Sequence, residues 1–492
     1  MRFGIEIIVF ICGAVVMIFE IVGSRILGPF LGTTIFVWTS LIGVILGSLS
    51  LGYWLGGYFA DKKPKIEILS TIIFLSAISI IFTTIIHRYF LNQLPNYNFD
   101  VRLQAVIASV ILFSPASIFL GMVSPYAIKL KLKHVNSTGK IAGNLYAIST
   151  VGSICGTFLA GFFLIPFFGH QNILFFLSAI LLIISIVLFF LTRLNNKAGF
   201  AILFLLFLFV LKFLILKQNN EVIDVDTKYN RVLIYNASDY RTGKSAKYMR
   251  INNEYSGAMF LDSDELVFQY LKYYDLSEHF NPDFRRSLLI GGATYSYPKH
   301  YLNKFPEASI DVVEIDPELT QLARKHFQLS DNPRMKIIHE DGRTFLNKYT
   351  EKYDVVFVDA FKSQYTLPYQ LTTREAVQKI YNVLNNDGIA ILNIISSIDG
   401  MKSLFLQAEY LTYQSVFQQV YLFVIQNLDD KEQLQSVVLV ALKSEKTPVF
   451  NSSDSVLNEY LQHLLINGIE TSVPILTDEF APVESYMNKA IQ

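Results

Sequence analysis

Seven long apolar runs occupy the first 218 residues of this 492-residue chain, and they constrain its fold more than any other feature. A helix that crosses a bilayer needs about 20 mostly apolar residues, and each run is long enough. The whole chain is 52% hydrophobic and only 17% charged, and charges in this half are few and clustered. We therefore predict a helical membrane domain over 1–218, in contact with the lipid bilayer. The predicted spans are about 4–23, 34–57, 67–87, 103–122, 141–166, 171–192 and 199–217.

The distribution of lysine and arginine predicts how these spans are oriented. Three connections on the same side as the N-terminus are basic, with Lys62, Lys63, Lys65, Lys129, Lys131, Lys133, Lys140, Arg193 and Lys197. The other side carries Arg25, Arg88 and Arg102. The positive-inside rule then makes the N-terminus cytoplasmic, and seven spans place the C-terminal half outside the cell membrane.

Small and charged residues inside the runs make two further predictions. Gly152, Gly156 and Ala160 recur at four-residue spacing, which lets a neighbouring helix approach closely. Glu20 is costly in a membrane unless it is paired, and Arg25 is a possible partner. The alternative for Glu20 is a role in transport or substrate binding.

The pattern changes near residue 222, where ordinary soluble composition begins. Short strand-like segments at 231–237, 246–252 and 257–261 predict a small antiparallel β module over 219–285, followed within it by a helix at 264–276. From 286 to the C-terminus at 492, apolar strands alternate with helices, which predicts a Rossmann-like parallel sheet covered on both faces. The runs at 421–425 and 436–442 are expected to form an antiparallel edge of that sheet.

Acidic residues and glycines stand where the predicted parallel strands end. Gly291 and Gly292 end the first strand, and Glu314 ends the second, at a distance that suits the two hydroxyls of a ribose. Asp341, followed by Gly342, ends the third strand, and Asp359 ends the fourth. Each acid alone could be a helix cap or turn residue. Because ligands bind beyond the carboxyl ends of such strands, the set predicts an adenosine site.

The glycine turn argues against a bound pyrophosphate. A dinucleotide turn needs a third glycine, but the chain continues here with Ala293, Thr294, Tyr295 and Ser296. An adenosine without phosphates fits better, such as S-adenosylmethionine or a relative. The eight scattered histidines indicate no metal site, and the zero net charge gives no sign of a nucleic-acid partner.

Several quoted segments resemble the spermidine synthase (polyamine aminopropyltransferase) family over roughly 222–445. They are "LLIGGATYSYPKHYL", "VVEIDPELTQLARKHF", "HEDGRTFL" and the segment that begins "DVVFVDAF". In the apolar half, "FEIVGSRILGPFLG" and "LGMVSPYAIKL" are similar to membrane-embedded spermidine synthase-like proteins, as is the late "LTDEFAPVE".

The resemblance implies a role for each strand-end acid. Glu314 would hold the ribose hydroxyls, and Asp341 would accept a hydrogen bond from the adenine amino group. Asp359 would be the catalytic aspartate that orients and deprotonates an attacking amine. The substrate would be S-adenosylmethionine or its decarboxylated form, with no further cofactor and with 5′-methylthioadenosine as leaving group. The resemblance also implies a possible homodimer.

We predict that Thr294, Lys362 and Gln269 contact the substrate, and three departures from the family pattern affect the acceptor. Thr294 replaces an acid in the glycine turn, Lys362 replaces a second acid after Asp359, and Phe268 replaces a tyrosine before Gln269. A lysine repels a polyamine but attracts the carboxylate of intact S-adenosylmethionine. That carboxylate could itself attack and give homoserine lactone; alternatively, Lys362 points to solvent.

Two other functions remain open at this point. A methyltransferase shares the sheet and the acids after the second and third strands. A transporter or sensor for a polyamine or a nucleoside would explain why the chain carries seven spans where one would anchor it.

Overall fold

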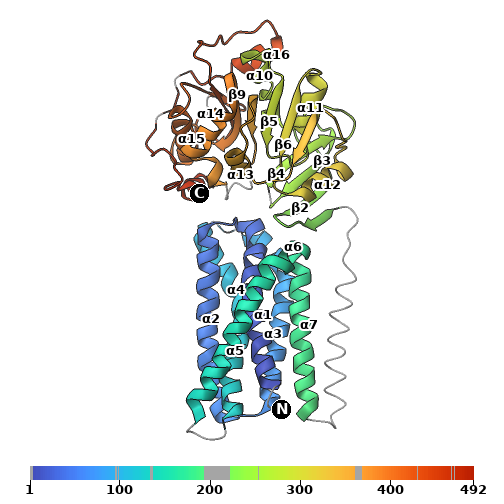
Figure 1. Ribbon diagram of the computed structural model, residues 1–492, viewed down its shortest axis with the longest axis vertical. Coiled ribbons are helices and arrows are strands. Elements are labelled where there is room, and N and C mark those ends of the chain that lie inside the picture. Colours follow the sequence, from blue (N-terminus) through green and yellow to red (C-terminus); the bar gives the residue numbers. More distant parts are fainter. Residues whose placement is uncertain are drawn as a thin grey trace. The chain divides into compact units, whose positions relative to one another are not determined.

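The computed structural model contains two compact units, Met1–Asn220 and Glu221–Gln492 (Figure 1). The described residues are 4–94, 97, 99–132, 137–192, 222–252, 254–360, 368–428, 430–466, 468–469 and 471–491. The predicted span at 199–217 and the predicted site residue Lys362 lie outside these ranges.

Six helices of the N-terminal unit are long and apolar enough to cross a membrane, which confirms six of the predicted spans. They are α1 (Gly4–Leu31), α2 (Ile35–Lys62), α3 (Ile66–Gln93), α4 (Val101–Lys131), α5 (Thr138–Leu159) with its continuation, and α7 (His170–Thr192). A π-helical turn (Ala160–Leu164) and the short α6 (Ile165–Phe167) continue α5. Most of these helices extend several residues beyond the predicted apolar runs. Polar caps set some of these ends, since the Thr34 side chain accepts from the Val37 amide at the start of α2.

The small residues of α5 allow close contact with α1, as predicted. A Cβ added to Gly152 would lie 2.1 Å from the Phe10 carbonyl oxygen, and one added to Gly156 would lie 2.5 Å from that of Ala14. Ala160 is fully buried. These positions therefore have a packing role, in which the absent side chains let two backbones meet.

Ion pairs tie together one end of the helical bundle. Lys129 Nζ, near the end of α4, lies 2.6 Å from Asp61 Oδ1 near the end of α2. Lys131 pairs with Glu6 in the first turn of α1. The basic connections after α2 and α4 therefore lie at the same end of the unit as the N-terminus, as the sequence analysis assumed.

The C-terminal unit begins with a four-stranded antiparallel sheet in the order β1-β2-β3-β4. Its strands are β1 (Ile223–Asp226), β2 (Arg231–Ser238), β3 (Ser245–Ile251) and β4 (Glu254–Phe260). The sequence analysis had predicted the last three of these strands and missed β1.

The helix predicted at 264–276 is wrong in extent. The structure has two short helices, α9 (Gln269–Tyr273) and α10 (Leu276–Phe280). Leu266 and Val267 lie before α9 outside any helix and are both buried, and Arg241 donates a side-chain hydrogen bond to the Val267 carbonyl. Burial of these two side chains against the sheets outweighs their helical spacing, because packing overrides a local preference.

The second sheet has seven strands in the order β10-β11-β9-β8-β5-β6-β7. The strands are β5 (Arg286–Ile290), β6 (Ser309–Val313), β7 (Met335–Ile338), β8 (Tyr353–Val358), β9 (Leu384–Ser396), β10 (Gln419–Val424) and β11 (Gln435–Leu442). The first five are parallel, whereas β11 and β10 complete the sheet as an antiparallel edge, which confirms the prediction.

Helices cover both faces of this sheet (Figure 1). They include α11 (Ser296–Lys304), α12 (Pro317–His326), α13 (Gly342–Lys348), α14 (Arg374–Val383), α15 (Leu404–Gln414), α16 (Ser455–Leu461) and α17 (Val483–Ile491). Alternate residues of β5 enter different cores: Leu288 and Ile290 belong to one cluster and Leu289 to another. Two-sided burial explains why the strands read as continuous apolar runs.

Candidate active site

The carboxyl ends of the central strands meet through backbone hydrogen bonds. The Gly291 amide donates to the Val313 carbonyl at 2.9 Å, and the Asp359 amide donates to the Ile290 carbonyl at 2.8 Å. Gly291, Glu314 and Asp359 each directly follow a strand, so the parallel register brings them to one edge of the sheet.

Gly291 is required at this edge by space and by backbone conformation. Its φ is +102°, and an added Cβ would lie 2.2 Å from the Asp359 carbonyl oxygen. No other residue type fits both conditions. The glycine therefore lets the end of β5 lie directly against the catalytic candidate.

The turn after Gly291 forms without the third glycine that the sequence lacks. Ala293 has φ +45° and Tyr295 has φ +56°, a left-handed conformation that costs about 1–2 kcal/mol for a residue with a side chain. The Tyr295 side chain is fully buried, and its hydroxyl lies 2.6 Å from that of Thr320 on α12. This anchoring offsets the strain, so a tyrosine occupies a position that usually favours glycine.

Thr294 connects the turn to the small sheet. Its side chain is buried, and its hydroxyl lies 2.8 Å from that of Ser296, which donates to the Ala258 carbonyl in β4. A Cβ on Gly257 would lie 2.2 Å from Thr294 Oγ1. The hydroxyl of this residue, which we predicted to contact substrate, is thus engaged inside the protein.

Both oxygens of the Glu314 carboxylate accept backbone hydrogen bonds. Oε2 accepts from the amides of Gly292 at 2.9 Å and Ala293 at 3.1 Å, and Oε1 accepts from Asp316 at 2.9 Å. Burial raises the pKa of this carboxyl, and the three amides act in the opposite direction. Oε2 thus has both of its lone-pair sites occupied, whereas Oε1 keeps acceptor capacity for one further donor, such as a hydroxyl.

Asp341 is the N-cap of α13. Its Oδ1 accepts from the Thr344 amide at 2.9 Å, and the side chain is exposed. The structural alternative weighed for this acid therefore holds, and its contact with adenine stays a prediction. Gly342 is buried, and a Cβ there would lie 2.6 Å from Ile290 Cγ2, so α13 begins close against β5.

Asp359 is partly buried and has one tyrosine partner. The Tyr270 hydroxyl donates to Asp359 Oδ2 at 3.0 Å. Burial raises the pKa of Asp359 to about 6, and the bond from Tyr270 acts in the opposite direction. Burial and the adjacent carboxylate raise the pKa of Tyr270 well above its usual value, so this phenol is a neutral donor.

Sequence reasoning missed Tyr270, although it noted Phe268 and Gln269 beside it. Gln269 is the first residue of α9 and is partly buried. A usable signal was the tyrosine spacing of this segment, because Tyr270 and Tyr274 lie one helical turn apart. Tyr274 stacks on Phe357 of β8 at a ring-centre distance of 5.2 Å, which holds α9 at the strand that ends in Asp359.

Metal ligation finds no support among the residues whose positions are described, because no three His, Cys, Asp or Glu side chains there are grouped to hold an ion. The arrangement instead offers a neutral phenol, two carboxylates at the sheet edge and a close backbone turn. It can bind hydroxyl and amine donors and can accept a proton.

Comparison with known proteins places these residues in a family context. A spermine/spermidine synthase domain matches residues 275–427. The chain is 27% identical over 215 residues to a polyamine aminopropyltransferase of Vibrio vulnificus, covering 42% of this chain and 69% of that protein. It is 24% identical over 396 residues to polyamine aminopropyltransferase 2 of Aquifex aeolicus, covering 73% of each. The latter match extends beyond the C-terminal unit into the apolar half.

Among solved structures, a probable spermidine synthase from Corynebacterium glutamicum is similar to this chain. The identity is 22%, the TM-score is 0.42, and the match covers 55% of this chain and 93% of that one.

Proposed function

Because the chain belongs to the spermine/spermidine synthase family and is an aminopropyltransferase-like transferase, we propose that it cleaves a sulfonium nucleoside. The substrate is S-adenosylmethionine or its decarboxylated form, and 5′-methylthioadenosine is released. The observation that best supports this proposal is the position of Asp359. Its carboxylate accepts a hydrogen bond from Tyr270, and it lies at the end of a strand beside the glycine turn.

Asp359 has the properties needed to bind and deprotonate an amine that acts as the acceptor substrate. A carboxylate here attracts an ammonium group and accepts its proton as the amine attacks the carbon next to sulfur. A pKa of about 6 leaves the group mostly ionised at neutral pH while keeping its basicity close to that pH. Sulfur leaves with the electron pair of the broken bond, so its positive charge is neutralised without an added acid.

Glu314 and the turn supply the nucleoside side of the proposed site. The carboxylate is held in place by backbone amides, and its Oε1 can still accept from one ribose hydroxyl. Asp341 lies after the next strand, where the family resemblance assigns the adenine amino group. The missing side chains of Gly291, Gly292 and Gly342 let Asp359, Tyr295 and Ile290 pack closely around the proposed nucleoside site, and Gln269 lies next to Tyr270.

The state of Thr294 bears on the acceptor. It stands where the family resemblance implies an acid, and its hydroxyl is engaged with Ser296. The turn thus offers no carboxylate to the amine of a second substrate. This observation supports an intramolecular version, in which the carboxylate oxygen of S-adenosylmethionine attacks its own γ-carbon. The carbon–sulfur bond breaks, and the products are homoserine lactone and 5′-methylthioadenosine, with no net proton transfer.

Product analysis tests the proposal and separates its versions. Purified full-length protein would be incubated with S-adenosylmethionine alone, and separately with the decarboxylated form plus putrescine. Release of 5′-methylthioadenosine in either reaction, above the rate without protein, supports the function, and the first reaction also supports ring closure. S-adenosylhomocysteine would indicate a methyltransferase instead. Binding or uptake with neither product would favour the transporter or sensor alternative.

We also propose a membrane topology and domain boundaries for the chain. The division is into 1–218, 219–285 and 286–492, with a cytoplasmic N-terminus and the segment 199–217 as a seventh span. The basic connections after α2 and α4 support this orientation, which puts the C-terminal unit outside. Protease added to intact cells should then remove that unit, whereas its protection would reverse the topology.

A further inference from the structure

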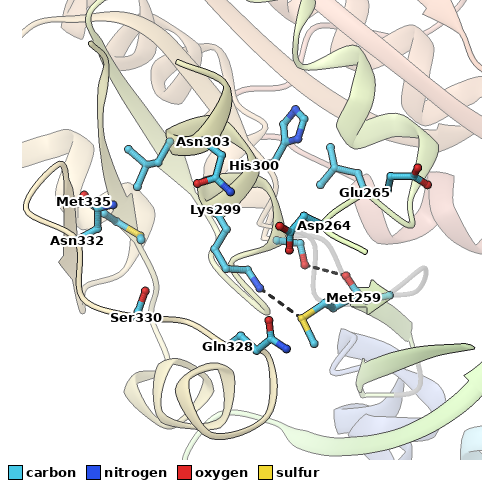
Figure 2. A pocket seen from close by; sticks show the side chains of 14 residues that line it. Met259, Asp264, Glu265, Lys299, His300, Asn303, Gln328, Ser330, Asn332 and Met335 are labelled. Carbon is cyan, nitrogen blue, oxygen red and sulfur yellow. Dashed lines mark hydrogen bonds between the residues drawn. The ribbon is translucent and has the colours of Figure 1, made fainter. Parts of the chain in front are cut away.

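A cavity of about 200 Å³ lies in the C-terminal unit (Figure 2). One wall is the face of α11 that carries Lys299 and Asn303, and another is the segment after α12 with Gln328 and Ser330. Asp264, from the segment between β4 and α9, forms part of a third wall. Gly291, Glu314, Asp341 and Asp359 do not line it.

Lys299 is the unusual member of this cavity. Its ammonium donates to the Phe327 carbonyl and lies 3.7 Å from Met259 Sδ, so both contacts are to uncharged groups. Within the described chain no carboxylate lies within ion-pair distance of it. Burial lowers the pKa of Lys299, and the carboxylate of Asp264 acts in the opposite direction without touching it. A partly buried cation with no counter-ion gains from an anionic ligand.

Of the other polar groups that line the cavity, Glu265, Ser296, His300 and Asn332 have protein partners. The side chains of Asn303, Gln328 and Ser330 make no hydrogen bond to the parts of the chain whose placement is described, and all three are exposed. Figure 2 shows Asn303 and Lys299 extending from one helix, with Asp264 on another wall. Amide groups can both donate to a carboxylate and accept from an ammonium.

We propose that this cavity binds a small zwitterionic amino acid, with its carboxylate on Lys299 and its ammonium facing Asp264. Opposite charges on different walls favour a ligand that carries both charges over one that carries either alone. The volume lies below the roughly 300–1,000 Å³ of sites for larger ligands, which limits the occupant to a few non-hydrogen atoms beyond the amino-acid core. Met259, Leu266 and Met335 give the cavity apolar surface for a flexible side chain.

Calorimetry on the full-length protein in detergent tests this with L-methionine as the probe. Two analogues each lack one charge: L-methioninol has no carboxylate, and 4-(methylthio)butanoate has no ammonium. L-Methionine should bind at least tenfold more tightly than either analogue. An absence of L-methionine binding, or equal affinity for L-methioninol, would overturn the proposal.

Matched variants locate the bound molecule. Lys299→Met should weaken L-methionine binding at least tenfold, whereas Lys325→Met, on the exposed surface of α12, should not change it. Asp264→Asn should remove the preference for L-methionine over 4-(methylthio)butanoate, and it decides the matter if Lys299→Met fails to fold. Asp359→Asn should bind L-methionine normally, so this result does not depend on the proposed reaction. Unchanged affinity in both cavity variants would contradict the site.

Discussion

The two units of this protein bury polar side chains in different ways. In the helical unit many hydroxyls bond within their own helix: Ser76 donates to the Ile72 carbonyl at 3.0 Å, and Ser178 donates to that of Leu174 at 2.8 Å. In the C-terminal unit the functional candidates find partners from distant elements. Asp359 and Tyr270 are 89 residues apart in the chain.

This difference separates structural polar groups from functional candidates. A hydroxyl that bonds one turn back along its own helix is satisfied wherever the helix packs. A carboxylate in a partly buried site stays ionised more readily when a hydrogen-bond donor is present. If that donor comes from another helix or strand, the donor's element must be correctly placed. Small changes at the sheet edge should therefore have large effects on chemistry, and similar changes in the helical bundle should not.

Asp359→Asn is expected to have the largest effect. Loss of a general base typically lowers turnover by about 10²–10⁴-fold, and we expect roughly 10³-fold for 5′-methylthioadenosine release in the reaction with an amine acceptor. Because the pKa of Asp359 in the folded protein, about 6, lies above the ordinary aspartate value of 3.8, ionised Asp359 destabilises the fold. Its cost develops as pH rises from 4 to 6 and reaches about 3 kcal/mol at neutral pH.

The same variant should therefore be more stable than the native protein at pH 7 and indistinguishable from it near pH 3. Denaturant unfolding of the C-terminal unit at both pH values measures this. Thr84→Val, which alters a hydroxyl bonded within α3, serves as the control and should change neither turnover nor the pH dependence of stability. A destabilised Asp359→Asn protein would indicate that the aspartate has a structural role.

A pair of glycine variants tests the comparison between units directly. Gly291→Ala and Gly152→Ala each place a Cβ within about 2 Å of a carbonyl oxygen, at 2.2 Å and 2.1 Å respectively. Gly291→Ala should lower turnover by about 100-fold, because it displaces the backbone of Asp359. Gly152→Ala should destabilise the helical unit by about 1–3 kcal/mol and leave turnover unchanged. Equal loss of turnover in both variants would refute the separation drawn here.

Tyr270→Phe should have a smaller, pH-dependent effect. Its hydrogen bond favours the ionised form of Asp359, so removing it raises the pKa of Asp359 further. The acid limb of the pH–rate profile should move up by roughly one to two units, which corresponds to a bond to a charged group. Turnover at pH 7 should fall by about two- to tenfold and recover at higher pH. Tyr273→Phe, which stacks on Tyr460, is the control and should not shift the profile.

Asp341→Ser should have the smallest effect and separates its two roles. Serine caps a helix about as well as aspartate, so α13 should keep its stability, whereas Asp341→Ala should lose about 1 kcal/mol. If Asp341 accepts from adenine, the shorter serine loses that contact and the KM for the nucleoside rises several-fold. An unchanged KM with Asp341→Ser would show that this acid is a cap alone.

Local patterns predicted most of the fold and part of the site. The lengths of the apolar runs indicated the helices, and strand–helix alternation indicated a parallel sheet with an antiparallel edge. Gly291, Glu314 and Asp359 were predicted to lie together because the carboxyl ends of parallel strands share one edge, and the structure brings them to that edge. The prediction of one helix over 264–276 was wrong in extent. The apolar residues there have helical spacing, but the segment that contains buried Leu266 and Val267 is not helical.

Residue order and spacing alone thus determined which elements form and which strand ends carry acids, because run length and periodicity are properties of neighbouring residues. Only the tertiary structure decided that the Tyr270 hydroxyl meets Asp359, that Thr294 packs against Gly257, and that no carboxylate of the described residues pairs with Lys299. These relations depend on how the small sheet and α9 pack on the larger sheet. Such contacts join residues far apart in the chain, and no local pattern encodes the distance between them.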